Sequence, residues 1–323
     1  MESCRKEKLH LTPLNISIPS YFPATSFFQT NQTSQEGFDL GRRLFYDGRL
    51  SKDGSISCAS CHQQIAAFGT YNHDLSHGIN GSHGIRNAMS LFNIAWQTSF
   101  GWAGKTTNLE TIYSDHISSS IEMGETITDV LAKLQSDSHY QQQFKAAFGT
   151  NVINQQRLFN ALTQFVTAML STATKYDSVK QNLAAFTASE QTGYTIFKTN
   201  CNSCHKEPLF TDGSYRNNGL PLTYLNDKGR MIVTGNKTDS LKFRVPSLRN
   251  LFKSYPFMHD GRFVSFDQVF DHYQSGIQQS ATLDPLLAGG IPLSVSDRVA
   301  LVDFFRTLTD NKFISDIRFT APQ

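Results

Sequence analysis

Two copies of a Cys-x-x-Cys-His motif constrain this chain more than any other feature of its sequence. They are Cys58-Ala-Ser-Cys61-His62 and, 143 residues later, Cys201-Asn-Ser-Cys204-His205. The motif is typical of haem c attachment, in which both thiols form thioethers and the histidine coordinates the iron. A zinc site would need its ligands to converge on one tetrahedron, and a redox dithiol needs neither the trailing histidine nor a second copy. The sequence therefore predicts two covalently bound haems c.

Length and composition favour one haem in each of two domains. The chain has 323 residues, enough for two domains of ordinary size, and each half carries one motif. Hydrophobic residues make up only 39% of the chain, but 25 of its residues are Phe, and the porphyrins would add apolar faces. We therefore expect the haems to form part of the domain cores.

Charge and hydropathy argue against nucleic acid and against a membrane span. The formal net charge is +2, and no basic run is long enough to suggest nucleic-acid binding. No stretch approaches the ~20 apolar residues of a membrane helix. Haem is attached to such motifs outside the cytoplasm, yet the charged residues 1–8 contain no apolar signal core. We expect that an export signal has been removed.

Cys4 is the one cysteine outside the haem motifs. Its surroundings look like the junction at which a bacterial lipoprotein is cleaved and acylated on cysteine, which would tether the protein to a membrane. An unused thiol in an unstructured tail explains Cys4 equally well, so both interpretations stay open.

Local patterning predicts a mainly α protein with two cytochrome c-like haem domains and long irregular loops. We expect an extended arm over residues 1–33, a first haem domain over 34–180 and a second over 181–323. Helical spacing begins near Ser34. A clear amphipathic helix near residues 158–170 closes the first half, with Met169 expected in the core rather than on iron.

Capping signals mark helices in the second half. Thr187 with Glu190 predicts the start of the helix that delivers Cys201, and Ser294 with Asp297 predicts another. The polar stretch 172–188 is expected to be a linker, and residues 213–240 to be a loop with a short hairpin. A haem motif after a helix in both halves suggests a duplicated cytochrome module.

With these motifs in place, residues 37–310 resemble the bacterial di-haem cytochrome c peroxidase family and, within it, the MauG- and MbnH-like branch. Besides the haem motifs, the resemblance rests on residues 41–51, Arg86-Asn87, Trp102, Leu109-Glu110, Glu122-Met123, residues 243–250 and residues 256–261. It implies a periplasmic protein whose first-half haem reacts with peroxide and whose second-half haem exchanges electrons with the first.

The resemblance implies a particular ligand for the second haem. Ordinary family peroxidases place a Met fourteen positions after the histidine that matches His259, whereas MauG-like proteins place a Tyr, and here this position is Tyr273. A phenolate favours ferric and higher oxidation states, so Tyr273 would make the second haem an acceptor of oxidising equivalents. If Tyr273 only packs and hydrogen-bonds, His272 or Met258 is the alternative ligand.

Two further residues take roles from the resemblance. Trp102 matches the tryptophan between the haems, where an indole can relay a hole, although a packed Trp can also simply fill space. Glu122 matches the acidic residue of the peroxide pocket, where a partly desolvated carboxyl can move a proton between the peroxide oxygens. An ordinary surface glutamate is the alternative.

The expected peroxide pocket departs from the family pattern. Ile112 stands in place of a Gln, and His116 stands in place of a Pro. His116 either replaces the missing polar group, coordinates the first haem or is a structural histidine. His77 is the nearest match to a distal ligand of the first haem, ahead of His73 and His83, but the MauG-like spacing around it does not require coordination.

A calcium ion between the domains is also implied. Asn87 matches its side-chain ligand, and backbone carbonyls are expected near Ser254 and Pro256. Oxygen donors of this kind suit calcium. The alternative is a turn-forming Asn.

These features lead to one favoured hypothesis and two alternatives. The first is a periplasmic di-haem enzyme that uses hydrogen peroxide to oxidise a residue, expected to be tryptophan, on a protein partner, and Tyr273 favours it. The second is a conventional peroxidase that takes electrons from a small cytochrome c or cupredoxin. The third is a non-catalytic electron-transfer cytochrome, which would follow if Ile112, His116 and His77 closed the peroxide site.

Overall fold

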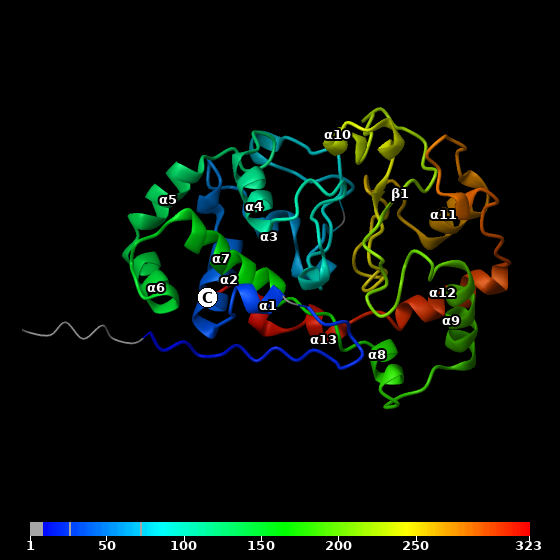
Figure 1. Cartoon of the computed structure of the whole chain (residues 1–323), viewed down its shortest axis with the longest axis horizontal. Helices are drawn as coiled ribbons and strands as arrows, with labels where there is room; N and C mark the ends of the chain where they lie inside the picture. Colours follow the sequence, from blue (N-terminus) through cyan, green and yellow to red (C-terminus); the bar gives the residue numbers. More distant parts are fainter. Residues whose placement is uncertain (1–8, 26, 72) are drawn as a thin grey trace, which may run out of the picture.

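Two helical lobes joined by long loops make up the computed structural model, which describes residues 9–25, 27–71 and 73–323 (Figure 1). The helices are α1 (Phe27–Thr30), α2 (Gln35–Tyr46), α3 (Cys58–Cys61), α4 (Leu109–Ser118), α5 (Ile127–Gln135), α6 (Ser138–Phe148), α7 (Gln155–Thr167), α8 (Lys175–Lys180), α9 (Ala188–Asn200), α10 (Met231–Thr234), α11 (Phe266–Asp271), α12 (Val295–Arg306) and α13 (Asn311–Ile314). Helices α2 to α7 form the first lobe, and α8, α9, α11 and α12 lie in the second. The mainly α class is confirmed.

The only sheet among the described residues is very short. Strands β1 (Tyr215–Arg216) and β2 (Phe243–Arg244) pair antiparallel, with Tyr215 opposite Arg244 and Arg216 opposite Phe243. The first strand begins near the start of the predicted loop 213–240, and the second lies just beyond its end.

The helix start predicted near Ser34 and the two predicted from capping boxes are confirmed. The Ser34 side chain accepts a hydrogen bond of 3.0 Å from the Gly37 amide at the start of α2. Complete capping boxes open α9 at Thr187 and α12 at Ser294. These bonds satisfy backbone amides that a helix leaves free at its first turn, so a local sequence pattern is enough to place the start.

Both lobes contain a pair of helices that cross at a glycine. A Cβ atom on Gly41 of α2 would lie 2.0 Å from the carbonyl oxygen of Ala161 in α7. In the second lobe, a Cβ atom on Gly193 of α9 would lie 1.9 Å from the carbonyl oxygen of Ala300 in α12. Only glycine allows backbones to approach this closely. The repeated arrangement agrees with the predicted duplication of one module.

Each lobe has its own hydrophobic core, and the chain end returns to the first. Phe313 and Phe319 pack in the first core together with Met169, which is buried there as predicted. The hydroxyl of Tyr46 in α2 donates a 2.7 Å bond to the Phe319 carbonyl, and Figure 1 shows the C-terminus beside α2. The second core is centred on Phe304 of α12.

Short helices occupy two segments that were expected to lack them. Within the arm, residues 9–25 carry no helix, but α1 follows, with the Thr25 hydroxyl accepting a bond from the Phe27 amide. Within the polar stretch 172–188, a capping box between Thr174 and Asp177 starts α8. Cys4 lies outside the described residues. No helix in the described part of the chain is both long enough and apolar enough to cross a membrane.

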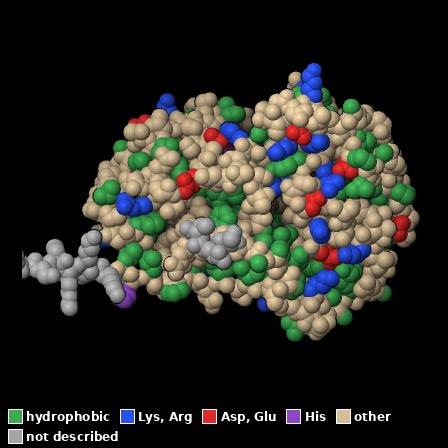
Figure 2. Space-filling view, in the orientation of Figure 1, with side chains coloured by type: hydrophobic (Ala, Val, Ile, Leu, Met, Phe, Trp, Pro, Cys, Tyr) green, Lys and Arg blue, Asp and Glu red, His purple; other side chains and the backbone are tan. Residues whose placement is uncertain are grey.

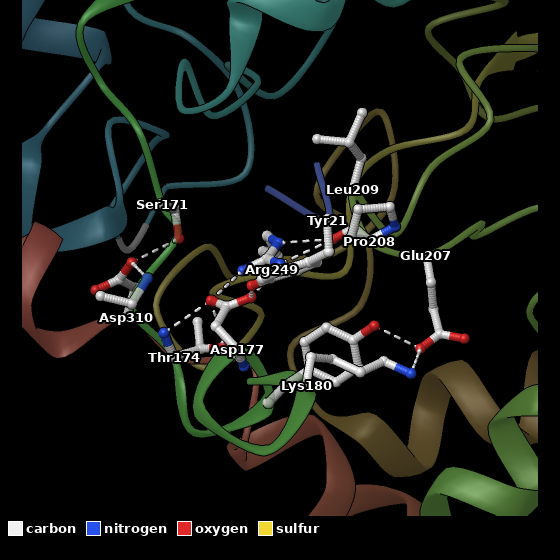
Figure 3. A network of polar contacts seen from close by, with 12 residues as sticks. Tyr21, Ser171, Thr174, Asp177, Lys180, Glu207, Pro208, Leu209, Arg249 and Asp310 are labelled. Carbon is white, nitrogen blue, oxygen red and sulfur yellow. Dashed lines mark hydrogen bonds and ion pairs between the residues drawn. The ribbon is translucent and has the colours of Figure 1, made fainter. Parts of the chain in front are cut away.

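A buried polar network ties the arm to the second lobe (Figure 3). Arg249 donates two hydrogen bonds to the carboxylate of Asp177, at 2.7 and 2.8 Å. The Tyr21 hydroxyl of the arm donates to the same carboxylate at 2.6 Å. The arm is therefore fixed across the junction of the lobes.

On the face drawn in Figure 2, acidic and basic side chains are interspersed over the second lobe.

Candidate di-haem active site

The first haem motif occupies the single-turn helix α3 and the residue after it. This turn brings Cys58 and Cys61 close together, and both are free thiols. His62 Nδ1 lies 2.9 Å from the Phe68 carbonyl, so the ring is fixed and Nε2 remains available. Burial lowers the pKa of His62 to about 4, which keeps the imidazole neutral with a lone pair for a metal. These features fit a proximal iron ligand.

The second motif follows α9 and has the same design. The Cys201 amide donates to the Phe197 carbonyl at 2.8 Å, which continues the helix into the motif. His205 Nδ1 lies 3.0 Å from the Pro246 carbonyl, and burial lowers the pKa of His205. Burial also raises the pKa of the Cys58 and Cys201 thiols to about 12, unlike the depressed pKa of a reactive dithiol. Both motifs therefore fit haem c.

Tyr273 lies beside the second motif, in a π-helical turn formed by His272–Gly276. Such turns occur mostly as single insertions at functional sites. Burial raises the pKa of Tyr273, and the charges of the Cys201 and Cys204 thiols act in the same direction. The phenol is thus within electrostatic range of both thiols. Coordination itself stays a prediction.

Asn218 lies among the three candidate ligands of the second haem, and no motif in the sequence pointed to it. Its side-chain amide donates to the Met258 sulfur at 3.6 Å and lies close enough to Tyr273 to act against the rise in the pKa of that phenol. Its backbone carbonyl lies 3.0 Å from Nε2 of the buried His272. Because Nε2 of His272 is already engaged, His272 could coordinate iron only through Nδ1, and the arrangement does not favour it over Tyr273.

Trp102 lies between the two lobes. Its indole N–H donates a 2.8 Å bond to the Asn87 carbonyl, and its ring centroid is 6.5 Å from that of His259. The Arg244 amide of β2 donates to the Trp102 carbonyl at 2.8 Å, which joins the loop to the second lobe. Trp102 also lines a cavity of about 220 Å³ whose walls come from both halves of the chain. This position suits a relay between two redox centres.

The three predicted calcium ligands face the same cavity. Asn87, Ser254 and Pro256 all line it. The Asn87 side-chain nitrogen donates to the carbonyls of His73 and Asp74, both at 3.0 Å, which leaves its oxygen for another partner. Oxygen donors fit a calcium ion. The ion remains a prediction.

The expected peroxide pocket contains a histidine and carboxylate pair. His116 Nδ1 and Glu122 Oε2 are 2.8 Å apart. Burial opposes protonation of His116, but this hydrogen bond and the charge of Glu122 outweigh it and raise the pKa of His116. Glu122 also acts electrostatically on Cys61 and His62, which places the pair beside the first motif.

The loop that carries Glu122 is held by its own backbone. The Ile79 amide donates to the Glu122 carbonyl at 2.8 Å, and a Cβ atom on Gly78 would lie 2.0 Å from the Ile121 carbonyl oxygen. Ile112, where the family has a Gln, packs partly buried against the first core. His116 therefore supplies a polar group that Ile112 does not.

His77 lies next to the first motif through its backbone. Its carbonyl accepts a 3.4 Å bond from the Cys61 thiol. Its imidazole is exposed and stands between those of His73 and His83, with centroid distances of 4.6 and 4.3 Å. Burial and the charges of these two neighbours lower the pKa of His77. Its coordination of the first haem stays a prediction.

Comparisons with known proteins agree with this geometry. Residues 35–185 match the family model described as di-haem cytochrome c peroxidase. The cytochrome c551 peroxidase of Nitrosomonas europaea is 30% identical over 281 residues, which cover 82% of this chain and 84% of that protein. The methylamine utilization protein MauG of Methylophilus methylotrophus is 31% identical over 261 residues, covering 79% of this chain and 77% of that one.

A solved structure is similar over almost the whole chain. It is the crystal structure of a MauG-like protein associated with microbial copper homeostasis, with a TM-score of 0.89 and 31% identity, covering 96% of this chain and 99% of that one. The fold and the paired sites define a c-type cytochrome with two haems. This chain belongs to the di-haem cytochrome c peroxidase family, whose members are oxidoreductases of the peroxidase and MauG kind. When bound, the haems supply iron that reacts with hydrogen peroxide and stores oxidising equivalents.

Proposed function

We propose that this protein is a periplasmic enzyme that uses hydrogen peroxide to oxidise a residue, expected to be tryptophan, on a protein partner. The observation that carries the proposal is the position of Tyr273, fourteen residues after His259 and in the π-helical turn His272–Gly276 of the second lobe. A phenolate ligand stabilises oxidised iron and so suits a site that stores oxidising equivalents rather than one that delivers electrons.

In this proposal the pair in the first pocket handles protons. Glu122 Oε2 and His116 Nδ1 share a hydrogen bond, and this bond and the charge of Glu122 raise the pKa of His116. Glu122 accepts a proton from one peroxide oxygen and returns it to the other, which becomes water. His116 holds the carboxylate in place and balances its charge.

Trp102 moves electrons between the two sites. Hydrogen peroxide takes up two electrons and two protons to give two molecules of water. The partner residue loses these two electrons one at a time, and each passes through the indole of Trp102. The hydrogen bond from Trp102 to the Asn87 carbonyl fixes the ring for this role.

Further parts of the proposal concern cofactors and organisation. We assign the peroxide-reactive haem to a domain over residues 34–180 and the second haem to one over residues 181–323. We also propose a calcium ion at Asn87, with the carbonyls of Ser254 and Pro256. A lipid on Cys4 is one of the two interpretations of that residue.

A conventional peroxidase is the second candidate, because relatives of nearly the same identity carry both names. It would reduce hydrogen peroxide with electrons from a small cytochrome c or cupredoxin. Many such enzymes become active only after the second haem is reduced, whereas phenolate ligation makes that reduction unfavourable.

Mixing the diferric protein with hydrogen peroxide, without reductant, distinguishes the candidates. We expect the haem absorption spectrum to change immediately, and we expect the lifetime of this change to exceed the mixing time of the experiment. In Trp102→Phe the change should not spread to the second haem, whereas Trp102→Tyr, which keeps an oxidisable ring, should restore part of it. A diferric protein that is inert to peroxide, together with a half-reduced protein that turns over with a small electron donor, would show that the proposal is wrong.

A further inference from the structure

Trp96, the other of the chain's two tryptophans, lines the same cavity as Trp102. It is the last residue of the short 3₁₀ helix Ile94–Trp96, and it is partly exposed. The two residues are six positions apart, so their Cα atoms are at most about 20 Å apart even in an extended chain. Both chain segments therefore bring an oxidisable indole to one space between the lobes.

The N-terminal arm holds the Trp96 indole. The indole N–H donates a 2.8 Å bond to the Pro23 carbonyl, and the ring packs against Phe22 with centroids 5.3 Å apart. The Thr25 hydroxyl donates to the Ala95 carbonyl at 2.7 Å. A carbonyl oxygen accepts this hydrogen bond but is too weak a base to remove the proton. Trp96 can therefore lose an electron while it keeps its N–H.

The turn that carries Trp96 is also fixed from the core side. Asn93 directly precedes the turn, and its amide donates to the Met169 carbonyl at 2.8 Å. Its side chain forms two hydrogen bonds with the backbone of Ser171, at 2.9 and 3.1 Å. An indole held from both sides reorganises little when its charge changes, which favours rapid electron transfer.

Tyr215 offers another oxidisable ring near Trp102, but its surroundings oppose a positive charge. A Cβ atom on Gly104, in the Trp102 loop, would lie 2.1 Å from the Tyr215 hydroxyl. The guanidinium groups of Arg230 and Arg244 stand over the ring, 4.1 and 5.0 Å from its centroid. Two cations this close make removal of an electron from Tyr215 unfavourable. A hole on Trp102 is thus directed away from Tyr215.

We propose that Trp96 is the relay through which oxidising equivalents leave Trp102 for the protein surface. The inference rests on the proposed function and names the exit of its electron path. Trp96 gives one electron to oxidised Trp102 and keeps its indole N–H, which stays hydrogen-bonded to the Pro23 carbonyl. The partner residue then gives one electron to Trp96. Two such passages supply the two electrons that, with two protons, reduce one hydrogen peroxide to two waters.

Without a partner, the relay residue itself should become oxidised. We would treat the diferric holoprotein with a few equivalents of hydrogen peroxide and map oxygen addition by peptide mass spectrometry. Trp96 should gain one oxygen atom, since its ring loses two electrons and two protons and takes an oxygen from water while peroxide is reduced. In Trp102→Phe this modification should disappear. Equal modification of Trp96 in Trp102→Phe would mean direct attack by peroxide and would overturn the inference.

A second readout separates relay from structural support. The peroxide-induced absorbance change should persist several-fold longer in Trp96→Phe than in wild type. The reason is that this variant lacks the indole that is the main internal electron donor to the oxidised site. Trp96→Tyr should restore most of the decay. Phe22→Leu, which removes the packing partner but keeps the indole, should decay like wild type. If Phe22→Leu is as slow as Trp96→Phe, and Trp96→Tyr restores nothing, then Trp96 only anchors the arm and the inference is wrong.

The two proposals fail in different ways. If the diferric wild-type protein does not respond to peroxide, the proposed function and the relay are both wrong. If wild type responds and Trp102→Phe blocks the response, while all Trp96 variants behave like wild type, the proposed function stands and the Trp96 relay is refuted.

Discussion

Replacing Asp177 with Asn tests how strongly the network in Figure 3 holds the arm and the second lobe together. The side chains of Arg249 and Asp177 are 0% and 1% exposed. Asn keeps the shape of the side chain but removes its charge. In Asp177→Asn, Arg249 would therefore stay buried without a counter-ion.

The expected cost follows from this burial. Removing one partner of a buried ion pair typically destabilises a protein by about 3–5 kcal/mol, because the remaining charge is uncompensated. The bond from the Tyr21 hydroxyl also weakens, since its acceptor loses its charge. For a domain of ordinary size, the loss corresponds to a Tm lower by roughly 6–20 °C.

The pH dependence gives an independent check. Burial opposes ionisation of Asp177, but the hydrogen bonds and charge of Arg249 outweigh it and lower the pKa of Asp177. A lowered pKa means that the pair stabilises the fold above the unfolded value of about 3.9 and that this stability is lost as the pH falls through the lower folded value. Asp177→Asn should therefore show less acid destabilisation below about pH 4.

Urea unfolding of the holoprotein, followed by circular dichroism, measures the effect. The matched control is Asp39→Asn, because Asp39 is 42% exposed and lies 3.5 Å from Arg42. The control should change stability by less than about 1 kcal/mol. If Asp177→Asn costs no more than Asp39→Asn, the buried pair does not hold the junction and the reasoning fails.

Two further predictions concern the site. Tyr273→Phe keeps the ring but removes the hydroxyl, so the low-spin electron paramagnetic resonance signal of the second haem should change; an unchanged signal would rule out Tyr273 as a ligand. Glu122→Gln should keep the full haem content, measured as pyridine haemochrome, while stopped-flow mixing shows the reaction with peroxide slowed by about 10²–10⁴-fold. If this variant reacted at the wild-type rate, Glu122 would not be the acid–base group, and His116 would be assigned that role instead.

Features set by neighbouring residues could be read from the sequence. The capping boxes at Thr187 and Ser294 start α9 and α12 because their hydrogen bonds span only three residues. The haem motifs could be recognised for the same reason, because each Cys-x-x-Cys-His motif lies within a short stretch of consecutive residues. Placing Met169 in the core rather than on iron was correct because its neighbours share one apolar helix face.

Features that depend on distant segments could not be read in this way. Asn218 lies near Tyr273 only because segments far apart in the sequence meet in the second lobe, and Trp96 and Trp102 line a cavity that residues from the other half of the chain complete. The short helix α8 was missed although Thr174 and Asp177 form a local capping box, because the six residues Lys175–Lys180 carry too short a pattern to predict a helix, and Arg249 from far along the chain balances the charge of Asp177. Propensity decides little in a helix of this length, and tertiary contacts decide most.

The two lobes share one backbone design but surround their haem sites differently. In the first, the side chains of His116 and Glu122 are 48% and 29% exposed, so protons can exchange with water. In the second, His272 is only 4% exposed and Tyr273 is partly buried. Cleaving peroxide requires a supply of protons, whereas storing an oxidising equivalent requires that water and small reductants be excluded. A duplicated module whose two copies diverged in this way supports a division of the reaction between a proton-handling site and a storage site, joined through Trp102.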